Sequence, residues 1–500
     1  MPQAGRRARR APVLVLLAIA LAACGSTVQT GSLAGGGDVV AGPGDGLAVP
    51  TTGAGATPAT AGPGLGPVGT GGAPTGPGLP TPTAPGTSAG PGPGVTAGGV
   101  DRRPVSVGII YTYNDDAGVD NGNTFTPRTA FEGIVNAWNA RGGMAGRRIV
   151  PIHVELNSTS TTISSDLQAA CETFTQDNHV AFVLSATGIY FESFAQCLSQ
   201  ASTPMIMGDY PLGDDDALMG APNVVAGSTV TVDTRLRVLL ERLVAAGRMK
   251  PGTDLLGIVI EGCAYNERAY ARTVVPVARR LGLRLAEPYT SRCFEGVGDL
   301  GGLASDMQGA VLRFGTSGVT QVVFVSGTEA NLLLLFATAA ETQGFHPRYG
   351  ITSAAAPAIQ EENTPGGQLA NAAGLGWLPA LDSTRTSGQA SAVQRRCLND
   401  LRTGSGVTPQ SPADRVYAYS ACDTVSLGDA VLRVTRGATG MAQVIGAVHA
   451  LGRSFAGAAT YAGATDFSDG RRTGPAQARL FAWSTGCGCF DYTGSPFALR

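Results

Sequence analysis

Lysine is almost absent from this chain of 500 residues. It occurs once, at Lys250, directly before Pro251 and Gly252, a sequence typical of a solvated turn. A phosphate-binding P-loop needs the lysine of its G-x-x-x-x-G-K-[ST] motif, and no such motif is present. The sequence therefore excludes P-loop nucleotide binding and leaves Lys250 as the single candidate for lysine-dependent chemistry.

Motifs for catalysis and metal binding are also missing. The four histidines are scattered without an H-E-x-x-H pattern. The single G-x-S-x-G match, at 86–90, lies in a Gly- and Pro-rich stretch and not between a strand and a helix, as a nucleophile elbow must. One oxygen-rich loop lacks the final bidentate glutamate of an EF-hand, which favours a solvated loop over a calcium site. Its oxygen-bearing residues are Asp115, Asp116, Asp120, Asn121 and Asn123. We therefore expect a protein that is not an enzyme and that has no metal and no cofactor.

Charge is scarce and nearly balanced. Charged residues make up 14% of the chain, and the formal net charge is −2. A nucleic-acid-binding protein needs a basic surface to neutralise phosphates, so this balance argues against nucleic acid as a partner.

Long apolar runs are absent, but a short one lies near the N-terminus. Four arginines between positions 6 and 10 precede the apolar segment 11–21, which is too short to cross a bilayer. The segment ends in Leu21-Ala22-Ala23-Cys24, which resembles the bacterial lipoprotein signal. That resemblance implies lipidation of Cys24 and anchoring at the extracytoplasmic face of the cell membrane. The alternative is an ordinary secreted protein with a chance cysteine.

Aromatic residues are missing from residues 25–103, which consist mainly of Gly, Pro, Thr, Ala and Ser. Such a segment buries too little apolar surface to offset the entropy of ordering. We expect a disordered linker between residues 1–24 and a folded region that covers residues 104–500.

Apart from Cys24, eight cysteines remain, an even number that suggests disulfides in an exported protein. Eight cysteines allow 105 pairings. Their order suggests local pairs, with 487 and 489 the least certain, because that pair would form a small ring and each thiol could instead pair elsewhere. The suggested pairs are Cys171 with Cys197, Cys263 with Cys293, Cys397 with Cys422, and Cys487 with Cys489.

Apolar periodicity after residue 104 predicts a βαβαβ series, which is typical of a parallel sheet with helices on both faces. The predicted strands are 105–110, 149–156, 180–184 and 205–207, and the predicted helices are 128–140, one around Cys171 and one through Cys197. The series restarts after a loop and short extended segment at 208–230, which predicts a second domain. There the predicted strands are 255–260, 284–289, 321–325, 349–352 and 373–377, with late strands at 467 and 479–483. The predicted helices are 236–243, 266–281 with a kink at Pro276, 329–341, 416–434 and 441–451.

The segment 136–149 (NAWNARGGMAGRRI) resembles a helix, Gly-Gly turn and strand found in leucine/isoleucine/valine-type substrate-binding proteins of ABC transporters. The segments 185–187 and 326–329, Tyr265 and the late turn 467–472 (FSDGRR) resemble the same family in order. The Cys171–Cys197 spacing is that of a disulfide common in the family.

The resemblance implies the two-lobed type I periplasmic-binding fold, in which each lobe is a parallel α/β sheet covered by helices. The chain would cross between lobes near 209–228, 375–385 and 452–462. Lobe 1 would comprise 104–208 and 386–451, and lobe 2 would comprise 229–374 and 463–500. A ligand would bind between the lobes at the carboxyl ends of the strands, and hinge closure would trap it.

Residues at these strand ends form the predicted ligand site, because strand-to-helix turns offer free N–H groups and hydroxyls to an anionic group. Lobe 1 would contribute Tyr111, Thr112, Ser185, Thr187, Gly208 and Asp209, and lobe 2 would contribute Tyr265, Thr328 and Glu329. Serine and threonine at strand ends also act as helix caps, and Glu329 could simply favour a helix N-terminus.

One segment departs from the family. Amino-acid binders place an acidic residue near 353–356 to hold the ligand ammonium, and here that segment is Ser-Ala-Ala-Ala. A branched-chain amino acid is therefore in doubt as the ligand, and amides, other small acids and aromatic metabolites remain open.

These features predict a lipid-anchored solute-binding protein that delivers a small polar metabolite to an ABC permease. An extracytoplasmic sensor that signals to a membrane partner would use the same clamp. A hydrolase on an α/β fold would need a nucleophile and a base, and the sequence shows neither.

Overall fold

The computed structural model describes residues 103–113, 125–157, 160, 162–208, 212–385 and 390–499. Cys24, the linker, the oxygen-rich loop at 115–123 and Asp209 lie outside the described residues. Among the described helices, none is both long enough and apolar enough to span a bilayer.

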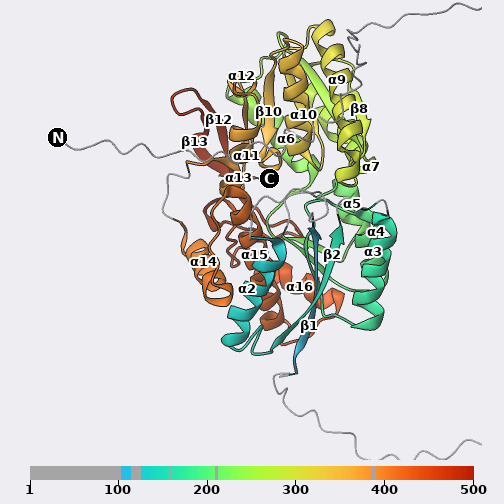
Figure 1. Cartoon of the computed structure of the whole chain (residues 1–500), viewed down its shortest axis with the longest axis vertical. Helices are drawn as coiled ribbons and strands as arrows, with labels where there is room; N and C mark the ends of the chain where they lie inside the picture. The colour runs from blue at the N-terminus through green and yellow to red at the C-terminus, as the bar shows by residue number, and fades with distance from the viewer. Residues whose placement is uncertain are drawn as a thin grey trace, which may run out of the picture. The chain divides into compact units, whose positions relative to one another are not determined.

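A five-stranded parallel sheet organises the first lobe, in the order β2-β1-β3-β4-β5. Its strands β1 and β2 are labelled in Figure 1. Its strands are β1 Val105–Tyr113, β2 Ile149–Asn157, β3 Val183–Ala186, β4 Met205–Met207 and β5 Val224–Ala226. Four of them were predicted from sequence. The fifth, β5, lies inside the segment 209–228 that was expected to cross between lobes, and it pairs with β4.

Helices cover both faces of this sheet because successive side chains of a strand point to opposite sides. Ile110 packs with the helices α3 and α4, whereas its neighbour Tyr111 packs with α2 and α15. The helices of this lobe are α2 Pro127–Ala140, α3 Ile163–Glu172 with its π-turn η2 Thr173–Asp177, α4 Glu192–Gln200, α5 Asp215–Gly220, α14 Ala392–Ser405, α15 Pro412–Val434 and α16 Met441–Leu451.

In helix α2 the sequence determines where the helix begins, which face is buried and how the chain turns into the next strand. The Thr126 hydroxyl accepts a hydrogen bond of 3.1 Å from the Thr129 amide and caps the helix, and Pro127 occupies the first turn. Phe131 and Ile134 are buried on the sheet side. At Gly143, with φ of +77°, a Cβ atom would lie 1.9 Å from the Arg147 carbonyl oxygen, so the turn into β2 requires glycine.

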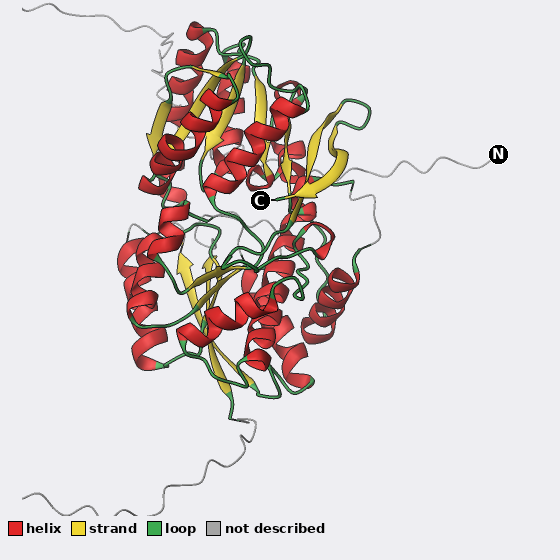
Figure 2. Ribbon diagram, turned by 180° about the vertical axis from the view of Figure 1, so that it is seen from behind, coloured by secondary structure: helices red, strands yellow, loops and turns green. Residues whose placement is uncertain are grey.

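An eight-stranded sheet organises the second lobe, in the order β13-β12-β11-β10-β9-β6-β7, with β8 also paired to β6. Its strands are β6 Leu255–Gly262, β7 Arg284–Leu285, β8 Tyr289–Arg292, β9 Gln321–Val325, β10 Arg348–Thr352, β11 Ala373–Gly376, β12 Gln477–Ser484 and β13 Cys489–Ala498. Strands β11, β12 and β13 are joined by antiparallel pairing, and the remaining neighbours are parallel. Helices cover this sheet as well (Figure 2). They are α6 Val232–Ala245, α7 Ala264–Ala269, α8 Val275–Arg280, α9 Leu300–Ser317, α10 Glu329–Thr342, α11 Pro357–Asn363, α12 Gly366–Leu369 and α13 Pro379–Asp382, with short turns η3 Tyr270–Val274, η4 Val297–Asp299, η5 Ser353–Ala355 and η6 Tyr461–Gly463.

Two predicted elements of this lobe are interrupted. The strand expected at 284–289 is two short strands, because Pro288 between them has no N–H for a ladder. The helix expected at 266–281 contains the π-turn η3 before Pro276, so the irregularity is a widened turn.

Three segments pass between the sheets and are bonded to one another. The Trp377 indole donates a hydrogen bond of 3.2 Å to the Ser228 carbonyl, and the Tyr461 amide donates one of 2.9 Å to the Trp377 carbonyl. Trp377 is fully buried. These three positions lie in or near the predicted crossings, while the lobe boundaries given above stay a prediction.

The four suggested disulfides are all present. They join Cys171 with Cys197, Cys263 with Cys293, Cys397 with Cys422, and Cys487 with Cys489. The first connects α3 to α4, the second connects the end of β6 to the end of β8, and the third connects α14 to α15.

Candidate functional site

A cleft of about 340 Å³ lies where strand-end loops of the two sheets meet. One wall comes from α3 and the loop after β3, and the other comes from the residues that follow β6 and β8. Four aromatic rings line it: Tyr190, Phe191, Tyr265 and Phe294. This is the place in an open α/β sheet where ligands are expected.

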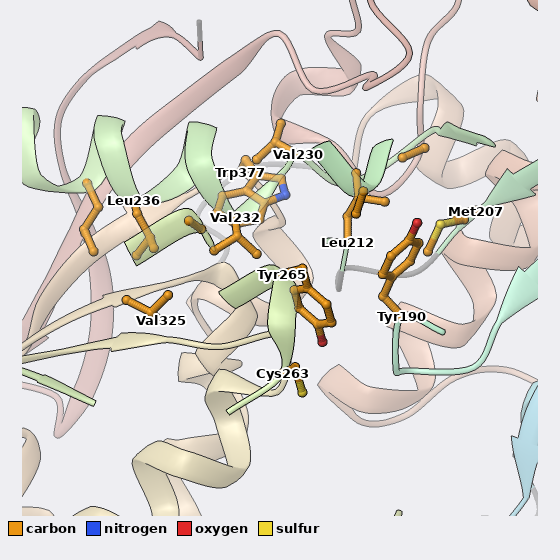
Figure 3. Close-up of a cluster of buried hydrophobic side chains, with 14 of the residues drawn as sticks. Tyr190, Met207, Leu212, Val230, Val232, Leu236, Cys263, Tyr265, Val325 and Trp377 are labelled. Atoms are coloured by element: carbon orange, nitrogen blue, oxygen red, sulfur yellow. The ribbon is translucent and has the colours of Figure 1, made fainter. Parts of the chain in front are cut away.

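Tyr190 and Tyr265 meet across the cleft from opposite lobes. Their rings are edge to face with centroids 6.0 Å apart, and both lie among buried side chains (Figure 3). Burial raises the pKa of both phenols, so neither ionises near neutral pH. Sequence reasoning named Tyr265 but missed Tyr190, which follows the predicted hydroxyl-rich loop by three residues.

Gly327 allows the Tyr265 ring to lie against the loop after β9. A Cβ atom at Gly327 would be 2.8 Å from the Tyr265 hydroxyl oxygen, closer than real Cβ contacts come. The loop therefore needs glycine for close approach.

A buried glutamate, Glu261, holds this same loop in place. Its carboxylate accepts hydrogen bonds from the Ser326 hydroxyl at 2.6 Å and the Gly327 amide at 3.0 Å. It also accepts from the Thr328 hydroxyl at 3.2 Å and the Phe294 amide at 3.1 Å. Glu261 was not among the residues predicted from the sequence, and the hydroxyl of Thr328, predicted as a ligand contact, is directed to this carboxylate.

Glu329 is the first residue of α10 and is also buried. Its carboxylate accepts hydrogen bonds from the Thr352 amide at 2.8 Å and the Thr352 hydroxyl at 2.5 Å. Burial raises the pKa of Glu329, against the effect of nearby Arg235 and the Thr352 bonds. The carboxylate thus joins α10 to β10, which gives it a packing role independent of any ligand.

Arg235 on α6 is buried beside both glutamates. Its Nη2 donates to the Ser326 carbonyl, whereas Nε and Nη1 have no hydrogen-bond partner in the part of the chain that the structure describes. Burial lowers the pKa of Arg235, and Glu329 and Glu261 counteract that shift. The glutamates therefore provide the compensating charge that a buried guanidinium needs.

Threonines of the first lobe hold the loop after β3. The Thr112 hydroxyl donates to the Thr187 carbonyl at 2.8 Å, and the Thr187 hydroxyl donates to the Ile189 carbonyl at 2.6 Å. Ser185 and Thr187 are both buried. These contacts fix the loop that carries Tyr190 to the cleft.

Two other predicted residues of this lobe face elsewhere. The Tyr111 ring stacks on Phe131 of α2 at 6.4 Å, and its hydroxyl donates to Glu155 at 2.8 Å. That is the opposite face of the sheet from α3, which lines the cleft. A Cβ atom at Gly208 would lie 2.3 Å from the Ser420 hydroxyl oxygen on α15, so packing against that helix requires this glycine.

The rim of the cleft carries the carboxylates Glu192 and Glu295. Glu192 forms an ion pair of 3.6 Å with Arg268 of α7, from the other lobe. Oxygen and sulfur atoms of Glu261, Cys263 and Cys293 lie within 4.8 Å of one another, as metal ligands would. The two cysteines are bonded to each other, so they offer no thiolate to a metal.

Known proteins resemble this chain in structure. No protein-family model matches the chain, and no curated protein matches it in sequence. An ABC transporter substrate-binding protein from Desulfitobacterium hafniense in complex with leucine matches with a TM-score of 0.52 and 15% identity, over 78% of this chain and 100% of that one. A solute-binding protein of an ABC transporter from Rhodopseudomonas palustris HaA2, in complex with p-hydroxybenzoic acid, matches with a TM-score of 0.57 and 14% identity, over 79% and 98%.

A third match is the branched-chain amino acid transporter substrate-binding protein LivJ from Streptococcus pneumoniae in complex with isoleucine. Its TM-score is 0.51 at 13% identity, over 79% of this chain and 99% of that one. All three matches cover nearly the whole of the known protein. Their sequence identity of 13–15% is too low to support more than a shared fold. The chain therefore has the two-lobed type I periplasmic-binding fold that is found in substrate-binding proteins of ABC transporters.

Proposed function

We propose that this protein is a lipid-anchored, extracytoplasmic solute-binding protein that captures a small polar metabolite for uptake by an ABC transporter. The observation that carries the proposal is the cleft of about 340 Å³ whose walls come from both lobes. Tyr190 and Tyr265 line it from opposite lobes, with their rings in edge-to-face contact. Closure of the lobes would bury a ligand and contribute binding energy without any chemical step.

The composition of the cleft favours a ligand with a flat or apolar body and a polar end. Four aromatic rings and the Cys263–Cys293 disulfide line it, together with aliphatic and serine side chains and two carboxylates. The segment 353–356 has no carboxylate for an ammonium group, and Glu329 is bonded to Thr352. An amide, an organic acid or an aromatic acid remains the expected ligand class. An amide can donate its N–H groups to the rim carboxylates Glu192 and Glu295, whereas an acid would bind with its carboxylate turned away from them.

Anchoring at the membrane is supported by the sequence Leu21-Ala22-Ala23-Cys24. A lipid at Cys24 would keep the binding domain near a permease, with residues 25–103 as the spacer. We expect a Cys24→Ser protein to be recovered in the soluble extract of the producing bacterium. Retention in the membrane fraction would contradict lipid attachment at this residue.

A thermal-shift screen of the processed protein against amino acids, amides, urea, organic acids and aromatic acids tests the binding function. A ligand at 100 times its Kd adds about 2.7 kcal/mol to the free energy of unfolding. Tyr265→Ala should weaken binding of that ligand at least tenfold, whereas Tyr417→Ala on helix α15 should leave the Kd unchanged. Equal affinities for wild type and Tyr265→Ala would place the ligand outside this cleft.

A sensor that signals to a membrane partner is the second candidate, because the same clamp serves both functions. Uptake of radiolabelled ligand by cells with and without the gene separates the two. Loss of uptake on deletion supports import, and unchanged uptake with a lost ligand response supports sensing.

A further inference from the structure

The fourth disulfide differs from the other three in what it connects. Cys487 and Cys489 are two positions apart, whereas the other pairs are 25 to 30 positions apart. Those three tie separate helices or strands together, so each closes a long loop of chain. The Cys487–Cys489 bond closes only a three-residue ring, which removes far less freedom from the unfolded chain.

The hairpin that carries this ring is held without the sulfur bond. Ser484 and Cys489 are already paired across β12 and β13, and the Gly488 amide donates to the Ser484 carbonyl at 2.9 Å. Behind the turn, the Phe490 ring meets Trp483 with centroids 5.2 Å apart. The Phe490 amide also donates to Glu361 at 2.7 Å. A bond between Cys487 and Cys489 therefore adds little to a turn that backbone pairing and aromatic packing have closed.

The ring is also open to a reactant. The turn between β12 and β13 projects from the second lobe (Figures 1 and 2). A Cβ atom at Gly488 would have no neighbour within 4 Å, and Thr485 and Gly486 are exposed. Cys487 is half-buried, whereas Cys489 is only 5% exposed. A thiolate can thus reach the sulfur of Cys487 more easily than that of Cys489.

We propose that Cys487 and Cys489 form a thiol-exchange site, reduced by a dithiol and re-oxidised by the reverse exchange with the corresponding disulfide, while the other three disulfides hold the fold. Its reactant is a dithiol. One thiolate of the dithiol attacks the sulfur of Cys487, the Cys487–Cys489 bond breaks, and Cys489 leaves as a thiolate that takes up a proton. The second thiolate of the dithiol then attacks the first sulfur of the dithiol, which is bonded to Cys487 in the mixed disulfide. The dithiol closes to a disulfide, and Cys487 is released as a thiolate. The dithiol loses two electrons and becomes a disulfide, and the cysteine pair gains them.

Graded reduction of the native protein tests this site. The oxidised protein is equilibrated with dithiothreitol at increasing ratios of reduced to oxidised reagent, free thiols are alkylated, and mass spectrometry quantifies each pair. We expect Cys487–Cys489 to be half-reduced at a ratio at least about tenfold lower than any other pair, because disulfides that do not stabilise the fold are the labile ones. One equivalent of dithiothreitol should be oxidised per protein, with no change in melting temperature. Reduction of this pair together with the others, or after them, would overturn the proposal.

Cysteine variants separate a reactive site from a structural bond. The double variant Cys487→Ser/Cys489→Ser should keep the melting temperature of the wild type and lose the early oxidation of dithiothreitol. A large fall in its melting temperature would mean that the bond is structural and would refute the proposal. Single variants test which sulfur is attacked. The free Cys487 of Cys489→Ser should react with a disulfide reagent about tenfold faster than the free Cys489 of Cys487→Ser, and the reverse order would refute the assignment of Cys487.

Discussion

Arg268 of the second lobe donates two hydrogen bonds of 2.8 Å to the carboxylate of Asp214 in the first lobe. Asp214 is only 2% exposed, and it also accepts a hydrogen bond of 2.9 Å from the Ala217 amide, which caps helix α5. The paired geometry is the strong form of an arginine–carboxylate contact. It joins the lobes beside the cleft, so it stabilises their contact in this structure.

Replacement of Arg268 by alanine should destabilise the protein and favour separation of the lobes. The variant leaves the Asp214 carboxylate buried without its cation, which costs about 1–3 kcal/mol of the free energy of unfolding. Urea denaturation measures the stability, and small-angle scattering measures the radius of gyration. Arg313→Ala is the matched control, because the partner Glu287 is largely exposed and sits on the protein surface. If both variants change the stability and the radius of gyration equally, the Arg268–Asp214 contact contributes no more than a surface ion pair.

Gly208→Ala should destabilise the first lobe through steric conflict with α15. The new methyl group would meet the Ser420 hydroxyl at 2.3 Å and the Thr424 methyl at 2.7 Å, and overpacking of this kind costs about 1–3 kcal/mol. Gly220→Ala at the end of α5 is the control, because a Cβ atom there has no neighbour within 4 Å. Thermal melts of the two variants compare them directly. If Gly208→Ala is as stable as Gly220→Ala, the close approach of α15 is not required.

Sequence periodicity predicted most of the scaffold because the signals are local. A buried strand such as 321–325 and an amphipathic helix such as 128–140 each carry their pattern in neighbouring residues. The order of the cysteines suggested the four disulfide pairs, whereas only the structure fixes them among the 105 possible pairings. The residues of β5 were assigned only to a loop and short extended segment at 208–230, because the place of this strand in the sheet depends on its pairing with β4.

The buried contacts inside the candidate site could not be predicted from local sequence patterns. Glu261 ends a buried strand, and its partners lie at Phe294 and Ser326, more than thirty positions away. Nothing local distinguishes a carboxylate that turns inward to bind a loop from one that faces a ligand. The requirement for glycine at Gly208 likewise comes from a helix some two hundred positions later in the chain.

Glu261→Gln tests this internal role. An amide offers one acceptor oxygen in place of two and presents an N–H group to donors, so about 1–3 kcal/mol of stability should be lost. Because the same carboxylate positions the loop against Tyr265, ligand affinity should fall as well. Glu267→Gln, on the neighbouring helix α7, is the control and should change neither quantity. Urea denaturation and ligand titration of both variants provide the measurement, and an unaltered Glu261→Gln protein would contradict the assigned role.

Two buried aspartates in or beside the segments that pass between the lobes predict a dependence of stability on pH. Asp423 on α15 accepts hydrogen bonds from the amides of Ala458 at 2.5 Å and Ala459 at 3.0 Å. Asp382 accepts from the Tyr492 hydroxyl at 2.6 Å and the Leu378 amide at 3.0 Å. In both, burial outweighs these bonds and raises the pKa from 3.8 to about 7.

The direction of the change in stability with pH depends on which state, folded or unfolded, binds more protons. Between pH 4 and 7 the folded protein keeps these two protons, whereas the unfolded chain has released them. The free energy of unfolding must therefore fall as pH rises through that window, by about 2–4 kcal/mol for each group. Above pH 7 the two groups add no further slope. Asp466, whose pKa is lowered because bonds from Ser468 and Arg453 outweigh burial, acts only below this window.

Asp423→Asn removes one of the two titrations. Its unfolding free energy, measured by urea denaturation from pH 4 to 8, should fall less steeply between pH 4 and 7 than that of the wild type. The free energy of unfolding of the variant should rise relative to that of the wild type as pH rises, because the asparagine side chain carries no charge that must be buried at pH 7. Asp469→Asn, at an exposed turn, should keep the wild-type slope. Parallel curves for wild type and Asp423→Asn would mean that Asp423 is ionised in the folded protein, held by the amides of Ala458 and Ala459.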